Sequence, residues 1–133
     1  MEQLRAENLR AGGTIRPHRF VKFGVTENTL LECDAGDAAI GISDRVGSPP
    51  SVTAGIQALE GERLDYVLIG ITDLLLGGAV DQGEYLVPDS EGRGVAYDPG
   101  SPAAVGARAL EGGVSGDLVR VKLVDAGPLA TGS

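Results

Sequence analysis

Aromatic residues are scarce in this sequence of 133 residues: they make up 4% of it, and tryptophan is absent. The core must therefore be built from valine, leucine, isoleucine and alanine. The single cysteine, Cys33, excludes an internal disulfide and a cysteine-rich zinc site. The chain also lacks an apolar run long enough to span a membrane, and its polar N-terminus does not look like a signal peptide. We therefore expect a protein made in a cytoplasm, with no membrane partner.

Basic residues are fewer than acidic residues in the whole chain, but they are concentrated near the N-terminus. The formal net charge is −8, which argues against general binding to nucleic acids. Residues 1–22 nevertheless carry five cations against two acids. This segment is either a docking arm or intersubunit surface, or simply a solvated end of the chain. The candidate contact residues are Arg5, Arg10, Arg16, Arg19 and Lys22.

Glycine and proline divide the chain into many short segments. The 21 glycines and 7 prolines fall between apolar runs, which is typical of frequent turns and short strands. We expect one all-β domain, a small β-barrel or β-sandwich of about eight short antiparallel strands. Its expected parts are an N-terminal arm over residues 1–13, a β domain over 14–124 with a long loop at 44–61, and a flexible C-terminal tail over 125–133.

The strongest strand signal spans residues 63–76. Apolar side chains occur on both faces of this segment, which predicts one central strand that is ended by Gly77-Gly78. In a later segment Val119, Val121 and Leu123 are expected to face the core, while Arg120 and Lys122 face solvent. The other predicted pairs are a hairpin of residues 84–87 with 94–97 and an antiparallel pair of residues 103–110 with 117–124.

One pattern occurs twice in the chain. Residues 38–43 read AAIGIS and residues 103–108 read AAVGAR, and each stretch is followed by Gly-acid and an apolar run, at 61–69 and 116–124. Each copy predicts a strand with a glycine at a close backbone approach, then a turn and a second strand. Two such hairpins could pack into one barrel or sandwich. The alternative is that Gly-acid-strand is a frequent hairpin formula and that the likeness is chance.

Side chains suited to catalysis are few. His18 is the single histidine, and a Ser-His-acid or Cys-His arrangement would need it. It follows Pro17 in a predicted edge strand, where a polar surface histidine is expected. Cys33 ends an apolar strand with no adjacent base, so we expect a small buried apolar side chain.

The acidic residues near glycine are better explained by turns than by metal sites. Asp34 with Asp37, and Asp89 with Glu91, have short spacing, but neither pair belongs to the ligand string of a calcium loop. The sequence also has no phosphate-binding loop and no dinucleotide-binding glycine motif. We therefore expect no enzymatic activity, no cofactor and no metal.

The order of several motifs is similar to a known family. The chain reads AGGTIRPHRFVKF, AAIGISD, GERLDYVLIGI, GGAVDQGEYLVPDSEGRGVA and AAVGARALEGGVSGDLVRVKL over residues 11–124. Its marks are Gly61-Glu62, the turn at Asp89–Arg93 and the Gly-Asp-x-Val-Arg-Val motif at Gly116–Val121. This order resembles the small capsid decoration (cement) proteins of tailed bacteriophages, a group catalogued as DUF2190-like.

The resemblance implies a β-rich virion protein without enzymatic activity. Such a protein would bind the outer surface of an assembled head, often as a homotrimer, and would stabilise the shell by bridging subunits of the major capsid protein. It would have no nucleic-acid partner. The family offers no catalytic residues to carry over to this chain.

Two other functions remain open on the sequence alone. One is a β-barrel module of a phage tail or head fibre that binds glycans or peptides in a shallow groove around Tyr66, Tyr85 and Tyr97. The other is a hydrolase that uses His18 with an aspartate or glutamate, which requires a pocket holding both groups.

Overall fold

The computed structural model describes residues 4–5, 10–43, 60–61, 66–98 and 104–124. These residues contain strands and turns but no helix, which confirms the expected all-β fold. Among them, no helix reaches the length and apolarity that a membrane crossing needs. The strands are β1 (Leu4–Arg5), β2 (Arg10–Ala11), β3 (Phe20–Phe23), β4 (Thr29–Glu32), β5 (Gly41–Ser43), β6 (Tyr66–Ile69), β7 (Ile71–Leu75), β8 (Tyr85–Pro88), β9 (Gly94–Ala96), β10 (Ala107–Ala109) and β11 (Leu118–Leu123).

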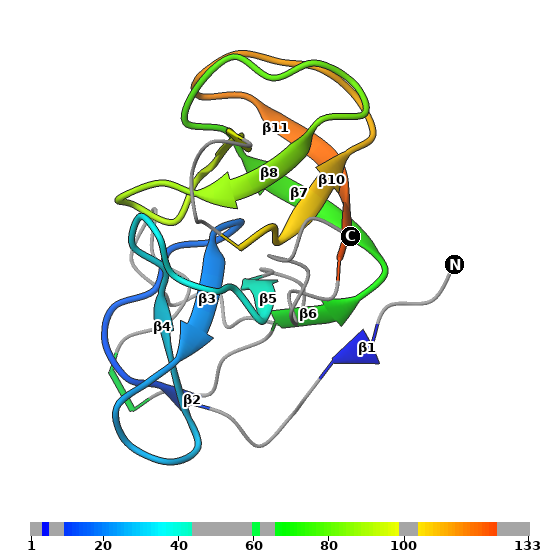
Figure 1. The fold of residues 1–133 in the computed structure, drawn as a ribbon. Coiled ribbons are helices and arrows are strands. Elements are labelled where there is room, and N and C mark those ends of the chain that lie inside the picture. Colours follow the sequence, from blue (N-terminus) through cyan, green and yellow to red (C-terminus); the bar gives the residue numbers. More distant parts are fainter. Residues whose placement is uncertain (1–3, 6–9, 44–59, 62–65, 99–103, 125–133) are drawn as a thin grey trace.

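The strands form two sheets, one from each half of the chain (Figure 1). The first sheet has the strand order β1-β6-β5-β3-β4-β2, and the second has the order β7-β11-β10-β8-β9. All neighbours are antiparallel except β2 and β4, which run parallel. The hairpin of β8 with β9 and the pairing of β10 with β11 confirm the two pairs predicted from the sequence.

The segment expected as one central strand is instead two strands in different sheets. The break lies at Gly70, whose φ of 111° is a conformation that favours glycine. β6 ends before Gly70 and pairs in the first sheet, and β7 begins after it and pairs in the second. The run of apolar residues on both faces therefore arises from a corner between sheets. Residues 63–65 of the predicted strand lie outside the described residues.

Residues of the expected arm take part in the first sheet. β1 pairs with β6, and β2 pairs with β4. Ala11, the second residue of β2, is fully buried. Most of the expected long loop, residues 44–59, and the expected tail, 125–133, lie outside the described residues, so the boundaries of the arm, loop and tail stay predictions.

The two sheets repeat one topology. In the second sheet, the chain order β7, β8, β9, β10, β11 gives the spatial order β7-β11-β10-β8-β9. In the first sheet, the strands β1, β3, β4, β5 and β6 give the corresponding order β1-β6-β5-β3-β4. The additional strand β2 also has a counterpart, because Leu76 forms a parallel bridge to β9 just as β2 pairs parallel with β4.

Backbone hydrogen bonds match between the two halves. Gly12 N donates to Leu30 O over 2.8 Å, and Gly77 N donates to Gly94 O over the same distance. Three further pairs of bonds correspond in the same way: Gly61 N to Ala11 O with Gly116 N to Leu76 O, His18 N to Ser43 O with Gly83 N to Ala109 O, and Cys33 N to Phe20 O with Tyr97 N to Tyr85 O. The pattern that occurs twice in the sequence is therefore part of a repeat that includes every strand.

Each repeat has its own set of core side chains at corresponding positions. The core of the first sheet consists of Ala11, Ile15, Val21, Leu30 and Tyr66. The counterparts in the second sheet that belong to its core are Leu76, Val80, Leu86 and Val121. Gly94 stands where the first repeat has Leu30.

The two repeats pack together so that one face of the first sheet contributes side chains to the core of the second. The core of the second sheet also contains Phe20, Cys33, Ala39 and Ile42, which come from the first repeat. The space against Phe20 is filled closely, because a Cβ atom added to Gly106 would lie 2.7 Å from the Phe20 ring. The outer face of the first sheet therefore closes the core of the second, which makes one body of the two sheets.

Candidate functional site

The candidate contact cations predicted from the sequence lie in strands β1, β2 and β3 of the first sheet and in the link between β2 and β3. Arg5 is in β1, but only its backbone is described. Arg10 is exposed in β2, and its Nη1 donates to Gly61 O over 3.3 Å. Arg16 and Arg19 lie in the link between β2 and β3, and Lys22 is in β3.

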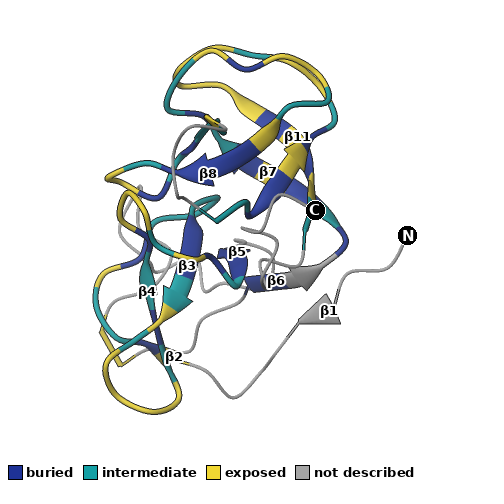
Figure 2. Ribbon diagram, in the orientation of Figure 1, coloured by how far each residue is buried: buried dark blue, intermediate teal, exposed yellow. Residues whose placement is uncertain are grey.

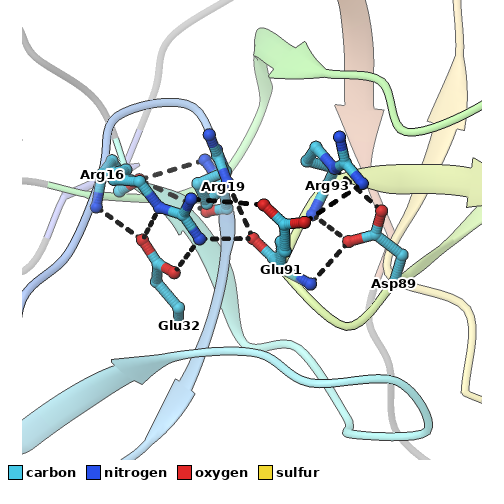
Figure 3. Close-up of polar contacts among 7 residues, drawn as sticks. Arg16, Arg19, Glu32, Asp89, Glu91 and Arg93 are labelled. Atoms are coloured by element: carbon cyan, nitrogen blue, oxygen red, sulfur yellow. Dashed lines mark hydrogen bonds and ion pairs between the residues drawn. The ribbon is translucent and has the colours of Figure 1, made fainter. Parts of the chain in front are cut away.

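Arg16 is the centre of an ionic cluster between the two sheets (Figure 3). Its Nε and Nη2 donate to the two carboxylate oxygens of Glu32 over 3.0 and 2.8 Å. Its Nη1 donates to Glu91 Oε1 in the β8–β9 turn over 3.3 Å. The hydrogen bond to Glu32 is the main reason why the pKa of Arg16 is raised. A bidentate guanidinium–carboxylate contact of this kind fixes geometry as well as charge.

The β8–β9 turn is fastened to the first sheet by backbone groups as well. Arg19 Nη1 donates to Glu91 O over 3.0 Å, and Phe20 N donates to Gly92 O over 2.7 Å. Burial lowers the pKa of Arg19. Within the turn, Asp89 accepts a hydrogen bond from Arg93 Nε over 2.9 Å. The cluster therefore joins the repeats, which is a structural role.

Lys22 is also paired within the chain. Its Nζ lies 2.6 Å from Asp37 Oδ2, and this contact raises the pKa of Lys22 and lowers that of Asp37. The side chains of Arg16, Arg19 and Lys22 thus bind groups within the chain. Their contact with a capsid or another subunit stays a prediction. Sequence reasoning missed the partner acids because Arg16 is separated from Glu32 by 16 residues and from Glu91 by 75.

His18 lies at the junction between the two sheets. Its φ is 60°, its Nδ1 is 3.3 Å from Asp73 O, and its own carbonyl accepts a hydrogen bond from Leu75 N over 3.0 Å. The corresponding residue in the second repeat is Gly83, with a φ of 89°. The His18 ring thus contacts a backbone carbonyl group. His18 itself lies where the chain turns, as Gly83 does in the second repeat.

Cys33 and the short-spaced acids have the roles expected of them. Cys33 belongs to the core, and burial raises the pKa of its thiol to about 12. Asp37 Oδ2 accepts a hydrogen bond from Asp34 N, and Asp89 Oδ1 accepts one from Glu91 N, so both acidic pairs close turns. Within the described ranges, no group of three or more histidine, cysteine or acidic residues is placed to hold a metal ion.

The three tyrosines do not share one groove. Tyr66 is 1% exposed and belongs to the first core, whereas Tyr85 is 45% exposed on the outer face of the second sheet. The Arg108 guanidinium lies over the Tyr85 ring, 5.3 Å from its centre. A groove around Tyr66, Tyr85 and Tyr97 is therefore not formed, because Tyr66 is buried.

A hollow of about 480 Å³ lies beside the first sheet. It is bounded by β2, by the turn between β3 and β4, and by Glu60 and Gly61. Its lining includes the polar side chains of Arg10, Glu27 and Asn28. His18 is not among the residues that line this hollow, so the hollow does not join the imidazole to a carboxylate.

Comparison with known proteins gives structural matches alone. No protein-family model and no curated protein matches the sequence. One solved structure is the N base of head fibre gp8.5 in bacteriophage phi29, with a TM-score of 0.59 and 14% identity, over 94% of this chain and 97% of the other. Another is a chain from the capsid of Myoviridae phage XM1, with a TM-score of 0.69 and 12% identity, over 95% and 86%.

These matches extend over nearly the whole length of both chains in each comparison. Because they cover 94% and 95% of this chain, they extend across both of its sheets. At these identities the likeness shows the fold. The chain therefore has the two-sheet β fold found in a phage head fibre and in a phage capsid.

Proposed function

We propose that this protein is a structural component of a phage virion that binds the outer surface of the head. There it stabilises the shell by bridging subunits of the major capsid protein, without enzymatic activity. The observation that carries this proposal is the shared fold with two phage head proteins over most of each chain. The proposal also agrees with the order of sequence motifs that resembles capsid decoration proteins.

The architecture suits a protein that must withstand mechanical force on a shell. The two repeats share one core, and the ionic cluster around Arg16 ties the β8–β9 turn to the first sheet. A body of this kind resists separation of its halves, because that would expose Phe20 and Ile42 and break the cluster. Many copies on one shell would gain from multivalency even if each contact is weak. The homotrimer implied by the resemblance is part of the same proposal.

The test is binding of the purified protein to expanded empty heads of the virus that encodes it. We expect the protein to sediment with the heads at saturable stoichiometry and to raise the temperature at which the heads disrupt. Unexpanded precursor shells are the control for binding to expanded heads. Absence of co-sedimentation at micromolar protein would overturn the proposal, and the mass of the free protein would test the trimer.

A second candidate is a ligand-binding module of a head fibre or tail. The hollow beside β2 favours it, since arginine, glutamate and asparagine side chains could form hydrogen bonds with sugar hydroxyls or a peptide. Binding of a glycan or peptide from an array that is lost in Asn28→Ala, with no binding to heads, would favour this candidate over the first.

A further inference from the structure

We propose that the outer face of the second sheet is the surface that docks on the shell, and that it recognises an acidic protein surface. This inference rests on the proposed function and names the docking face. The face is formed by β8, β10, β11 and β7. Its residues are Tyr85, Arg108, Leu118, Arg120 and Lys122, with Asp73 at its side.

The face is exposed and basic. Exposed and buried residues alternate along β11 (Figure 2). Arg120 and Lys122 are exposed positions of this pattern, so they lie on the face away from the core. Tyr85 is exposed and Leu118 is 52% exposed, which adds apolar area to the charge. The three cations Arg108, Arg120 and Lys122 compare with the acid Asp73 on this face and with Glu111 beside it, whose Oε2 accepts a hydrogen bond from Arg120 N over 2.8 Å. The face is thus basic although the whole chain has a net charge of −8.

Two of the cations are neighbours on adjacent strands, although the Arg108 guanidinium lies over the Tyr85 ring and its Nε donates to Gly83 O over 3.1 Å. Arg108 and Lys122 are direct cross-strand partners in the pairing of β10 with β11. Like charges directly opposite one another on neighbouring strands are destabilising. Within the described residues, neither Lys122 nor Arg120 forms an ion pair through its side chain, although Asp73 is the register partner of Arg120. An anionic partner would supply a counter-charge for the exposed side chains of Arg120 and Lys122.

The first repeat has apolar packing residues at the positions where this face has cations. Arg108 pairs with Tyr85 as Ile42 pairs with Phe20 in the first repeat, and Lys122 corresponds to Val67. Phe20 and Ile42 are buried against the second sheet. At the corresponding positions of the second sheet Tyr85, Arg108 and Lys122 are exposed, and cations stand in place of the aliphatic side chains, although Val87 on the same strand as Tyr85 is buried. Its chemistry therefore fits a wet, charged interface rather than a further apolar layer.

An acidic protein surface fits this face better than DNA or a second copy of the chain. The net charge of −8 opposes approach to a polyanion over the whole molecule, whereas a local patch of acidic side chains can meet the basic face alone. A second copy stacked as the repeats are stacked would have to bury Arg108 and Lys122 in an apolar core, which is costly.

The test compares two variants of equal net charge in sedimentation with expanded heads. Arg108→Gln/Arg120→Gln/Lys122→Gln removes three cations from the face. The matched control Thr14→Glu/Ala35→Glu/Ser90→Glu adds three acids at exposed positions that are outside the strands and outside this face. We expect the first variant to lose at least tenfold in affinity and to show a weaker salt dependence. The control should stay within about twofold of the original protein at moderate salt.

Each result has a separate meaning. If the original protein binds heads and the face variant binds equally well, the docking face is wrong and the proposed function stands. If the original protein does not bind heads at all, the proposed function fails first. Binding to naked DNA in place of heads, or a face variant that changes only the mass of the free protein, would also overturn the inference. Should the triple variant melt early, Lys122→Gln alone must still weaken binding.

Discussion

The two repeats have the same strand order, yet they fill their cores in opposite ways. In the first repeat Ala11 lies beside Leu30, whereas in the second Leu76 lies beside Gly94. A Cβ atom added to Gly94 would lie 2.4 Å from Leu74 Cδ2 and 3.6 Å from Leu76 Cδ2, so leucines occupy the space. Each pair thus combines one large and one small residue, and the large residue is on opposite strands in the two repeats. The comparison teaches that the fold conserves core volume rather than residue identity.

The outer faces of the two sheets also differ. Phe20 and Ile42 of the first sheet are buried by the second repeat, whereas Tyr85 and Arg108 at corresponding positions are exposed. The same backbone therefore supports an internal joint in one repeat and a free surface in the other. This is the arrangement of a short repeat array whose last unit carries a polar outer face.

The largest effect is expected from breaking the volume balance of the first repeat. Leu30→Gly should lower the free energy of unfolding by about 2–5 kcal/mol, because it leaves a cavity in the first core. Adding Ala11→Leu copies the arrangement of the second repeat and should recover part of that loss. Urea unfolding of both single variants and the double variant measures the coupling. Simple additivity of the two changes would contradict the compensation.

A smaller effect is expected from a glycine that has no counterpart in the second repeat. A Cβ atom at Gly41 would lie 2.5 Å from Val67 O, whereas the corresponding position of the second repeat is Ala107, which has a Cβ atom. Gly41→Ala should cost about 1–3 kcal/mol. Ala107→Gly is the matched control and should cost about 0.5–1 kcal/mol. Equal costs by thermal unfolding would show that the two positions do not differ.

His18 and Gly83 provide a third test, because both adopt positive φ at corresponding turns. Gly83→Ala should destabilise by about 1–2 kcal/mol, the cost of a Cβ in this conformation. His18→Gly removes that cost at its own position and should change stability by less than about 1 kcal/mol. It should also leave binding to heads unchanged. A large loss of function in His18→Gly with intact folding would restore the catalytic reading of the histidine.

The smallest effect concerns the pH dependence of the Lys22–Asp37 pair, which the second repeat lacks. The folded pKa of Asp37 is lowered, so its stabilising contribution is present above the usual carboxyl pKa and is lost as the pH falls through the folded value. Asp37→Asn should therefore reduce stability at pH 7 by about 0.2–1 kcal/mol and leave it nearly unchanged at pH 2. Denaturant unfolding at both pH values measures this; an equal loss at pH 2 would assign it to the turn.

The fold class and the repeat were largely readable from the sequence. Alternating apolar residues predicted β11 and its inward valines, and Gly61 and Gly116 marked equivalent turns before β6 and β11. The twofold AAIGIS and AAVGAR pattern located the copies but set them one residue out of register, since Ser43 corresponds to Ala109 by hydrogen bonding. Periodicity identifies strands, whereas register depends on the partner strand.

Other features could not be read because they depend on contacts far apart in the chain. The corner at Gly70 looks like a glycine within one long strand until the two sheets are seen. The paired glycines at 12–13 and 77–78 were a signal for the full repeat, although the strands between them share little sequence. The cations near the N-terminus appeared free, but Arg16 and Lys22 have acidic partners that only the fold brings to them.

The central claim is that this two-repeat β body attaches to a phage head through the outer face of its second sheet. Electron cryomicroscopy of expanded heads saturated with the protein tests it most directly. We expect added density on the outside of the shell, oriented so that Arg108, Arg120 and Lys122 meet acidic side chains of the capsid protein. Heads without added density, or density in which this face points to solvent, would contradict the account.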